Sequence, residues 1–541
     1  MLVEIILGFF VLLGFLYYKL IRNRNYWYDR NVPNTGFKFF YGDDKGIFTR
    51  EESFFDSILR TYQEFEGVPF FGGWTLFGKP FLMIRNDFDL VRSIWVKDFD
   101  HFALADSGSS VGKSIWPATR HEKIVLNNVT SASGDEWKDI RSTFSPIFTS
   151  GKLRKMAPLL HAISKNMIGY VAKLAESQTE FETKELAGKF SIDGIASCAF
   201  GVDSGSFDDE KSEFLYHGKE VFNFENPWII IKFIFSTITP NVIKKTAAKM
   251  GLVNMFSYPF ANEHSLFLMH IVEESFKQRK ESKIKRNDLI DMMIDAVEEK
   301  QIDVEEKDMH ANDQFEEDAK IVNHENKNKI SYDDVIATAL IMLSAGYETT
   351  GQTMAYILYE LAINEHCQDA LYDEIRDAGG DVSEFSYETI QAMPYLDAVI
   401  HETLRKHPIA AFLERVCTKE YKMPGHDFVI PKGGIVRLSN IGICYDPEIF
   451  PDPKKFDPER FLRENRGDRS PYSFLGFSTG PRNCLAMRFA MFEMKICIAS
   501  LVSSFRFLPC DKTTNDIKWD PKSILGGALG GLWIKCENRL V

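Results

Sequence analysis

The chain carries long stretches of helical periodicity and only a few short strand-like segments. Apolar residues that recur every three to four positions predict helices around Trp137 and over residues 153–175, 331–361, 367–378, 387–406 and 484–505. Short alternating patterns fall between residues 54 and 96 and over 429–438, where we expect minor antiparallel hairpins. No segment repeats at a period of roughly 20–50 residues. The pattern therefore predicts a mainly α fold with a small antiparallel β part.

Residues 1–20 form one apolar run, MLVEIILGFFVLLGFLYYKL, which is about as long as a helix that crosses a bilayer. Its charged residues, Glu4 and Lys19, lie near its two ends, where they can reach the interface. Three basic residues follow the run and none precedes it: Arg22, Arg24 and Arg30. This asymmetry predicts a transmembrane anchor over residues 1–21, with the N-terminus in the lumen and the rest of the chain in the cytoplasm. A cleaved signal peptide, the alternative, would have a basic start and a small-residue cleavage site, and neither is present.

Composition marks two further boundaries. Residues 22–42, with Pro33 and Gly36, form a short aromatic and polar hinge that directs the chain away from the membrane normal. Residues 303–328 are strongly polar, so we expect a solvated, mobile insertion there. Residues 43–541 are long enough to bury a large core and form the predicted main domain.

The overall composition narrows the class of protein. With 45% hydrophobic and 26% charged residues, the chain of 541 residues resembles ordinary globular proteins rather than disordered or collagen-like ones. The net charge of -13 argues against a nucleic-acid-binding protein, which usually carries a basic surface. The 8 cysteines include no C-x-x-C pair, which removes the main signatures of structural zinc and of thioredoxin-type chemistry. The simplest interpretation is that the cysteines are reduced thiols and that the protein resides in a reducing compartment.

One cysteine stands in a setting that favours its thiolate. Cys484 lies in the segment FSTGPRNCLAMRFA, at the start of a predicted amphipathic helix whose dipole and first backbone N–H groups stabilise a negative charge. Gly480 allows a tight turn, Arg482 places a cation two residues before the sulfur, and Phe477 can cover it from water. A cysteine at a helix start is more often a buried small hydrophobic residue. The pattern F-x-x-G-x-R-x-C favours a ligand instead.

This loop resembles that of the cytochrome P450 superfamily, the haem-thiolate monooxygenases. The resemblance implies a P450 fold with haem b (iron protoporphyrin IX) and with Cys484 as the axial thiolate ligand of the metal. It assigns further cofactor contacts to Phe477, Gly480, Arg482 and Ala486. Three positions depart from the family pattern. Ala486 replaces a glycine, so its methyl group is expected to tilt the helix or the macrocycle slightly, and Gly476-Phe477-Ser478 stands where relatives usually show Pro-Phe-Gly.

Two more motifs of this superfamily follow in the expected order. Glu402-Thr403-Leu404-Arg405 is an E-x-x-R sequence on a predicted helix, which in isolation would be an ordinary surface ion pair. Residues 456–461, FDPERF, match the family's meander, whose arginine completes a Glu-Arg-Arg network. The resemblance therefore implies that Glu402, Arg405 and Arg460 are structural residues that hold the core behind the cysteine loop.

The haem propionates need cationic or indole donors at fixed positions. Trp137 and Arg141 stand four residues apart and so share one helix face. A core tryptophan beside a solvent-exposed arginine would show the same spacing, but the family pattern W-x-x-x-R favours propionate contacts. Arg415, in LERVC, and Arg482 match two further propionate-binding positions, and a planar guanidinium pairs bidentately with a carboxylate.

The segment SAGYETT, residues 344–350, is expected to lie over the cofactor on a long helix. Ala345 and Gly346 are small, which fits either close helix packing or an open space for O₂ and substrate. By resemblance, Ala345 contacts the cofactor, and Glu348 and Thr349 form the catalytic acid–alcohol pair that relays protons. Thr349 is also expected to bond back to the preceding turn of the helix.

Substrate contacts follow from family position and apolar character. The predicted lining residues are Ile341, Ile409, Ala410, Leu413 and Leu525. An aromatic stretch is either a pocket roof or a membrane-dipping surface: Phe222, Phe224, Trp228, Phe233 and Phe235. A plain apolar core explains each of these residues equally well. A largely apolar pocket would suit lipophilic substrates such as steroids, fatty acids or foreign compounds.

The resemblance implies a microsomal monooxygenase of the endoplasmic reticulum membrane, which inserts one oxygen atom of O₂ into such a substrate. Electrons must come from outside, because no G-x-G-x-x-G follows a predicted strand. The implied partner is an NADPH-cytochrome reductase, with a cytochrome b-type protein as a second donor. A docking patch, or simply a solvated face, is formed by Lys138, Lys152, Arg154, Lys155 and Arg488.

Several segments, among them HPIAAFLERVC and GPRNCLAMRFA, look closest to the animal clan that holds the vertebrate 3A-type drug-oxidising enzymes and thromboxane synthase. Two alternatives therefore stay open. One is a haem-thiolate isomerase or synthase that needs neither reductase nor O₂, and the other is a catalytically silent haem or lipid binder. Ala345, Glu348 and Thr349 favour oxygen activation, whereas only Ala486 and the altered segment 476–478 support a silent binder.

Overall fold

The structure is a computed structural model. It describes residue 14, residues 17–102, 119–202, 204–208, 212–221, 260–282, 284–286, 288–298 and 330–539, and single positions at 231, 232, 239, 246 and 250. The predicted insertion at 303–328, the five aromatic residues between 222 and 235 and most of the predicted anchor lie outside these residues. Within the described part of the chain, no helix combines the length and the apolar character needed to cross a membrane.

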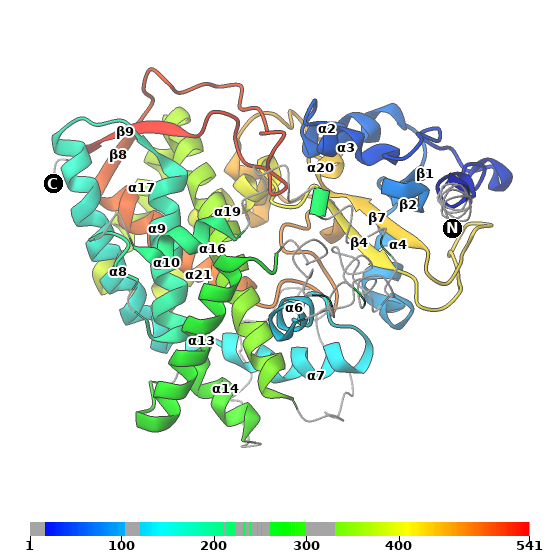
Figure 1. The fold of residues 1–541 in the computed structure, drawn as a ribbon. Coiled ribbons are helices and arrows are strands. Elements are labelled where there is room, and N and C mark those ends of the chain that lie inside the picture. The colour runs from blue at the N-terminus through cyan, green and yellow to red at the C-terminus, as the bar shows by residue number, and fades with distance from the viewer. Residues whose placement is uncertain are drawn as a thin grey trace.

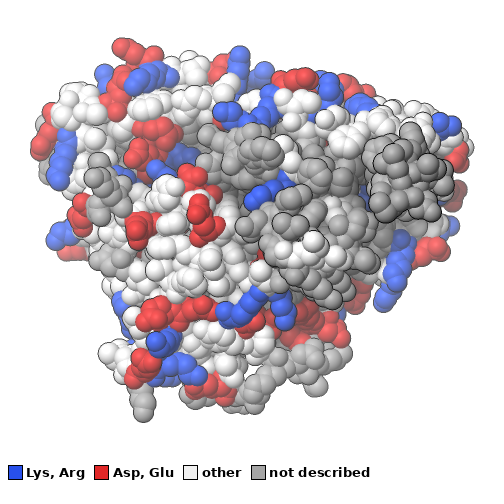
Figure 2. All heavy atoms as spheres, viewed as in Figure 1, with Lys and Arg blue, Asp and Glu red and all other residues white. Residues whose placement is uncertain are grey.

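Helices make up most of the described chain and gather on one side of the molecule, on the left in Figure 1. The longer ones are α8 (Ser150–Glu176), α9 (Thr183–Ile195), α13 (Glu263–Ser282), α16 (Tyr332–Ile363), α17 (Glu365–Asp377), α19 (Pro394–Lys406) and α21 (Met487–Ser504). The shorter ones are α2 (Lys45–Thr49), α3 (Phe54–Glu64), α4 (Phe88–Arg92), α6 (Arg120–Leu126), α7 (Gly134–Phe144), α10 (Glu213–Glu220), α14 (Leu289–Val297), α18 (Tyr387–Gln391) and α20 (Asn440–Cys444). On the face seen in Figure 2, acidic and basic side chains are mixed rather than gathered by sign.

Strands of the described residues form small sheets, the largest on the right in Figure 1. That sheet has the order β1-β2-β7-β4 and consists of β1 (Phe70–Trp74), β2 (Pro80–Ile84), β7 (Ile435–Ser439) and β4 (Phe412–Val416). The others are β3 (Phe181–Glu182) with β9 (Trp533–Asn538) and β8 (Phe505–Leu508), and β5 (Tyr421–Lys422) with β6 (Val429–Ile430). A mainly helical fold with a small β part is therefore confirmed.

The hairpin predicted over residues 429–438 is wrong. Strand β6 pairs with β5, whereas β7 pairs in parallel with β2 and antiparallel with β4. Between β6 and β7, Gly433 adopts a positive φ of 84°, and its N–H donates to the Cys417 carbonyl at 2.7 Å. A turn of this shape, which glycine adopts without strain, leads the chain out of one sheet and into another.

Most predicted helices are confirmed to within a few residues, but one is split. Residues 387–406 form α18 and α19 rather than one helix, because Pro394 has no N–H to continue the hydrogen-bond ladder. Met393 is extended (φ -94°, ψ 95°), as the residue before a proline usually is. The helix predicted from residue 484 begins at Met487 instead.

Helix α16 is the buried centre of the helical side, with most of its residues inaccessible to solvent. Its N-terminus is closed by a capping box, in which the side chains of Ser331 and Asp334 accept from each other's backbone N–H. Helix α9 crosses it at short range, since a Cβ atom added to Gly351 would lie 3.3 Å from the Cα of Gly188. The two glycines let the helix backbones approach closely and so fix the position of α16.

A buried ion-pair network ties α19 to the segment 457–461. Arg405 donates to both carboxylate oxygens of Glu402, at 2.7 and 2.8 Å, and both side chains are fully buried. Arg460 Nε lies 3.5 Å from Glu402 Oε1, and the Asp457 N–H donates to the same oxygen at 2.9 Å. Removing one member of such a network leaves a buried charge without its partner, at a typical cost of ~3–5 kcal/mol. These contacts support a structural role for the three residues.

Residues 22–42, the predicted hinge, lie against β1. Trp27 is 2% exposed, and its indole N–H donates to the Gly73 carbonyl at 2.9 Å. The Gly72 N–H donates to the Pro33 carbonyl at 2.7 Å, and a Cβ atom at Gly72 would overlap the Trp27 ring. The N-terminal segment is thereby docked on the sheet.

Candidate functional site

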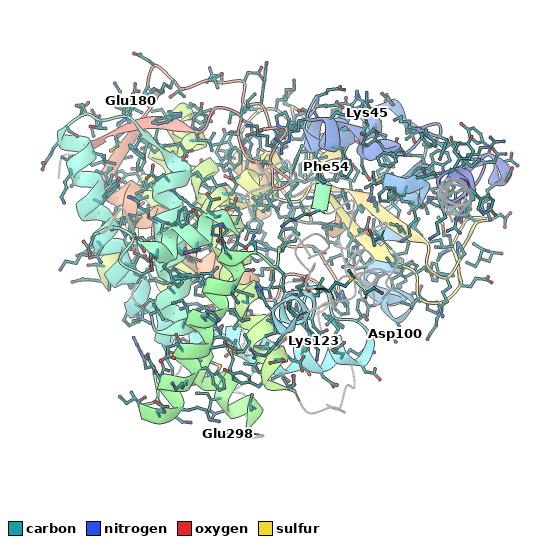
Figure 3. All side chains as sticks on the ribbon, in the orientation of Figure 1. Lys45, Phe54, Asp100, Lys123, Glu180 and Glu298 are labelled. Carbon is teal, nitrogen blue, oxygen red and sulfur yellow. The ribbon has the colours of Figure 1, made fainter. Side chains whose placement is uncertain are left out.

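A cavity of about 1330 Å³ lies between α16 and the four-stranded sheet. Ligand pockets usually measure ~300–1000 Å³, so this one has room for a cofactor and a substrate together. Its walls include α16, α21, the segment 409–415 and the turn 524–525, and Cys484 lies in its lining. Phe54 at the start of α3, labelled in Figure 3, also lines it.

The Cys484 loop is held by backbone hydrogen bonds. The Cys484 N–H donates to the Phe477 carbonyl at 2.9 Å, and the Ala486 N–H donates to the Cys484 sulfur. Burial raises the pKa of the Cys484 thiol, whereas the Ala486 N–H and the charge of Arg141 lower that pKa. Two details differ from the sequence prediction: the helix begins three residues after the cysteine, and the cation that favours its thiolate is Arg141 rather than Arg482.

Two of the departures from the family loop, Ala486 and Ser478, have different structural consequences. Ala486 has φ -98°, a conformation open to any residue, so its Cβ causes no backbone strain. Ser478 has φ 62°, in the left-handed region where glycine is the usual residue. Gly480 has φ 73°, and a Cβ atom there would lie 1.9 Å from the Trp95 carbonyl oxygen. At position 480 the neighbouring backbone therefore leaves no room for a side chain, whereas a Cβ atom at Gly476 would meet the Phe474 ring at 2.8 Å.

Buried and partly buried cations line one part of the cavity. Arg141, Arg415, Arg482 and Trp137 all line it, and the Arg482 guanidinium lies 4.5 Å from the centre of the Trp137 ring. Burial lowers the pKa of Arg141 and of Arg415 to about 10, and burial with the charges of Arg415 and Arg141 lowers the pKa of Arg482 to about 9. Within the described residues, Arg415 Nε and Nη2, Arg482 Nε and Trp95 Nε1 are buried without a hydrogen-bond partner.

These donors fit the anionic edge of a haem. Burying a guanidinium without an anion is costly. Three arginines lie close together here, and two of them, Arg415 and Arg482, have buried N–H groups without a hydrogen-bond partner, so the cavity favours a negatively charged ligand. Two propionates would supply that charge, and the thiol of Cys484 would supply the metal ligand in the same cavity. The donor set therefore agrees with the cofactor that the sequence motifs imply.

Some residues that support this set were not predicted from the sequence. Arg141 donates to the Asn483 carbonyl at 2.8 Å and to Asn483 Oδ1 at 2.6 Å, so Asn483 joins α7 to the cysteine loop. Trp95 comes from the short turn after α4. Ile195, Cys198 and Ala199 also line the cavity. Nothing in the sequence marks these positions, because each is an ordinary residue type whose role depends on tertiary contacts.

The two residues of the predicted proton relay on α16, Glu348 and Thr349, have different neighbours. Thr349 lines the cavity, and its Oγ1 donates to the Ala345 carbonyl at 2.8 Å, the back-bond expected from the sequence. Glu348 is absent from the described cavity lining, and its carboxylate accepts from Lys184 Nζ of α9 at 2.6 Å. Neighbouring residues of a helix face different directions, which explains the separation.

The predicted substrate contacts all reach the cavity. Its lining includes Ile341, Ile409, Ala410, Leu413 and Leu525, together with the predicted cofactor contacts Ala345, Phe477 and Ala486. Glu402, Arg405 and Arg460 are absent from the described lining. The site therefore has an apolar wall, a cationic edge and one cysteine.

Comparison with known proteins agrees with this geometry. The family model for cytochrome P450 matches residues 78–528. Cytochrome P450 6B1 of Papilio polyxenes is 32% identical over 536 residues, which cover 98% of each chain. Cytochrome P450 6a2 of Drosophila melanogaster is 31% identical over 545 residues, or 99% of each chain. These relatives are insect proteins, and the likeness to vertebrate 3A-type enzymes stays a prediction.

Sequence motifs, cavity and relatives lead to the same assignment. The chain belongs to the cytochrome P450 family, whose members are oxidoreductases of the monooxygenase type that carry haem with a cysteine thiolate as axial ligand.

Proposed function

We propose that this P450 inserts one oxygen atom of O₂ into a C–H bond of a lipophilic substrate. The other oxygen atom leaves as water. Its reduction consumes two protons and the two electrons of NADPH, which a flavoprotein reductase delivers. The observation that carries the proposal is the large cavity, in which an apolar wall, Cys484 and a cluster of buried arginines share one space. An apolar wall favours substrates such as steroids, fatty acids or foreign compounds.

Within this proposal, Cys484 would bind the haem iron and the arginines would hold the propionates. Bound haem supplies oxygen activation and the oxidation of the substrate C–H bond. The Ala486 N–H stabilises the negative charge on the Cys484 sulfur, and Phe477 shields it from water. Arg141, Arg415 and Arg482, with Trp137, orient the cofactor through charge-assisted hydrogen bonds.

Protons enter along α16. The Glu348 carboxylate, paired with the partly exposed Lys184, exchanges protons with solvent, and the Thr349 hydroxyl holds one at the cavity wall. A half-turn of the Thr349 side chain away from the Ala345 carbonyl would direct its hydroxyl into the cavity. Ala345 leaves this wall free of bulk, so that O₂ and a substrate carbon can come close to it.

The docking surface for the reductase is proposed from charge. Arginine and lysine residues lie at 138, 152, 154, 155 and 488, and positive charge suits acidic electron donors. Two of these cations already have acidic neighbours, since Lys138 pairs with Asp100 and Arg154 pairs with Glu388. A cytochrome b-type donor would use the same face.

A membrane location is part of the proposal. The apolar run 1–20, followed by Arg22, Arg24 and Arg30, supports an anchor in the endoplasmic reticulum with the catalytic domain 43–541 in the cytoplasm and 22–42 as connecting segment.

Deleting residues 1–21 should release the protein from microsomes, because the apolar run is the proposed anchor. The full chain should stay in the pellet after an alkaline carbonate wash, and the shortened chain should move to the supernatant. Protease added to sealed microsomes should cut the full chain. Protection of the catalytic domain, or retention of the shortened chain in the pellet, would contradict the proposed anchor and orientation.

Reconstitution with NADPH-cytochrome reductase tests the reaction. We expect a lipophilic probe to be converted only with both NADPH and O₂ present, with one atom of ¹⁸O₂ in each product molecule. Mass spectrometry of the product and NADPH consumption are the measurements. Product formed without NADPH and O₂ would instead identify an isomerase, and a haem-loaded protein that consumes no NADPH with any probe would identify a silent binder.

Replacing the buried arginines tests the cofactor site. Each charge-assisted hydrogen bond contributes about 1.5–3 kcal/mol, so Arg415→Leu or Arg482→Leu should weaken haem retention by about tenfold or more. Transfer of haem to an excess of a haem-scavenging protein measures the loss. Arg60→Leu, which removes an exposed arginine paired with Glu52 and Glu64, is the matched control and should retain haem normally. Equal haem loss from all three variants would contradict the assignment.

A further inference from the structure

Two chain segments that carry predicted substrate contacts pack against each other beside the cavity. One follows α19 and contributes Ile409, and the other is a turn in the connection between β8 and β9 that contributes Leu525. A Cβ atom added to Gly526 would lie 3.2 Å from the Pro408 carbonyl oxygen, so the turn and the segment are in contact. The shape of this apolar wall therefore depends on how the two segments are held relative to each other.

Tyr356 of α16 contacts both segments. It is 1% exposed and absent from the described cavity lining, so it lies behind the wall. Its hydroxyl donates at 2.6 Å to the carbonyl of Gly526, the residue after Leu525. Its ring stacks on that of His407, two residues before Ile409, with 4.0 Å between the ring centres and 3° between the ring planes. One side chain thus joins α16 to both segments.

The His407 ring is itself held in place. Its Nε2 lies 2.6 Å from Oε1 of Glu360, which stands one turn after Tyr356 on α16. Burial lowers the pKa of His407 and so favours the neutral ring, whose Nε2–H donates to this carboxylate. Glu360 Oε2 also accepts from Lys406 Nζ and from Asn364 Nδ2, both at 3.1 Å. The Tyr356 ring therefore stacks on a surface that is fixed by hydrogen bonds.

A second tyrosine of α16 makes the same kind of bond to a part of the chain away from the cavity. Tyr359, also 1% exposed, donates to the Thr514 carbonyl at 2.8 Å and accepts from the Thr514 N–H at 2.7 Å. Thr514 belongs to the same connection between β8 and β9 but is absent from the described cavity lining. Tyr356 and Tyr359 thus share residue type, helix and burial, and differ in which part of the connection they hold.

We propose that Tyr356 is a positioning residue for substrate specificity: it holds the Leu525 turn and the segment 407–413 together, and so determines which ligands fit the apolar wall. This inference rests on the proposed function, because it concerns the substrate specificity of the same site. Loss of the hydroxyl would free the Gly526 carbonyl and let the turn move, whereas the ring would keep its contact with His407. A wall that is already in place binds a ligand more tightly, since fewer groups must be ordered on binding.

Two azoles of different size measure this effect. Imidazole and clotrimazole both offer a nitrogen to the haem iron, and the shift of the haem absorption band gives each dissociation constant for the full-length holoenzyme. Clotrimazole carries three aromatic rings that reach the apolar wall, whereas imidazole is too small to do so. In Tyr356→Phe we expect clotrimazole to bind about two- to tenfold more weakly, the effect of one neutral hydrogen bond. Imidazole should bind as it does to the unaltered protein.

The matched control is Tyr359→Phe, which removes the same hydroxyl three residues along α16 and loses two hydrogen bonds instead of one. It should leave both dissociation constants unchanged. Hydrogen–deuterium exchange reports on the two anchoring points directly and needs no ligand and no turnover. Amides of residues 519–528 should exchange faster in Tyr356→Phe, and those of residues 511–516 should exchange faster in Tyr359→Phe.

Each other outcome has a definite meaning. Equal loss of clotrimazole affinity in both variants would show general destabilisation and overturn the proposal. So would unchanged clotrimazole affinity in Tyr356→Phe, an equal weakening of imidazole, or unchanged exchange at residues 519–528. The proposed monooxygenase function fails separately. If no lipophile supports NADPH consumption, that function is wrong, while azole binding and hydrogen exchange still decide whether Tyr356 positions the wall.

Discussion

The contact between Arg141 and Asn483 is the interaction on which the site depends most. It joins helix α7 to the loop of Cys484 through two hydrogen bonds, and it places a guanidinium charge close enough to lower the pKa of the thiol. The same arginine belongs to the cationic edge of the cavity, where burial disfavours its charge. Arg141 thus helps to fix the position of the Cys484 sulfur and favours its ionised form. It also adds to the buried positive charge that an anionic cofactor would balance.

The remainder of the fold supplies fixed walls for that arrangement. Gly188 and Gly351 let α9 and α16 pack closely, which sets the wall that carries Ala345 and Thr349. Strands β4 and β7 form the opposite side, and β4 carries Arg415 of the cationic edge.

Much of the site could be predicted from sequence because it depends on local spacing. Trp137 and Arg141 fall on one helix face by simple periodicity, and the loop pattern around Cys484 is specific. What could not be predicted depends on contacts between distant segments. The parallel pairing of β7 with β2, the cavity-lining position of Cys198 and the ion pair of Glu348 with Lys184 leave no trace in a local pattern. Pro394 by itself indicates a break between two helices, but the apolar periodicity on both sides of it favoured one continuous helix.

The most direct test of the account is the carbon monoxide difference spectrum of the reduced protein, recorded for the unaltered chain, Cys484→Ala and Cys497→Ala. Cys497 lies fully buried on α21 and provides a matched cysteine outside the described cavity lining. We expect the red-shifted Soret band of a thiolate-ligated haem for the unaltered chain and for Cys497→Ala, and its loss in Cys484→Ala. Retention of that band in Cys484→Ala, or its loss in Cys497→Ala alone, would contradict the assignment of the ligand.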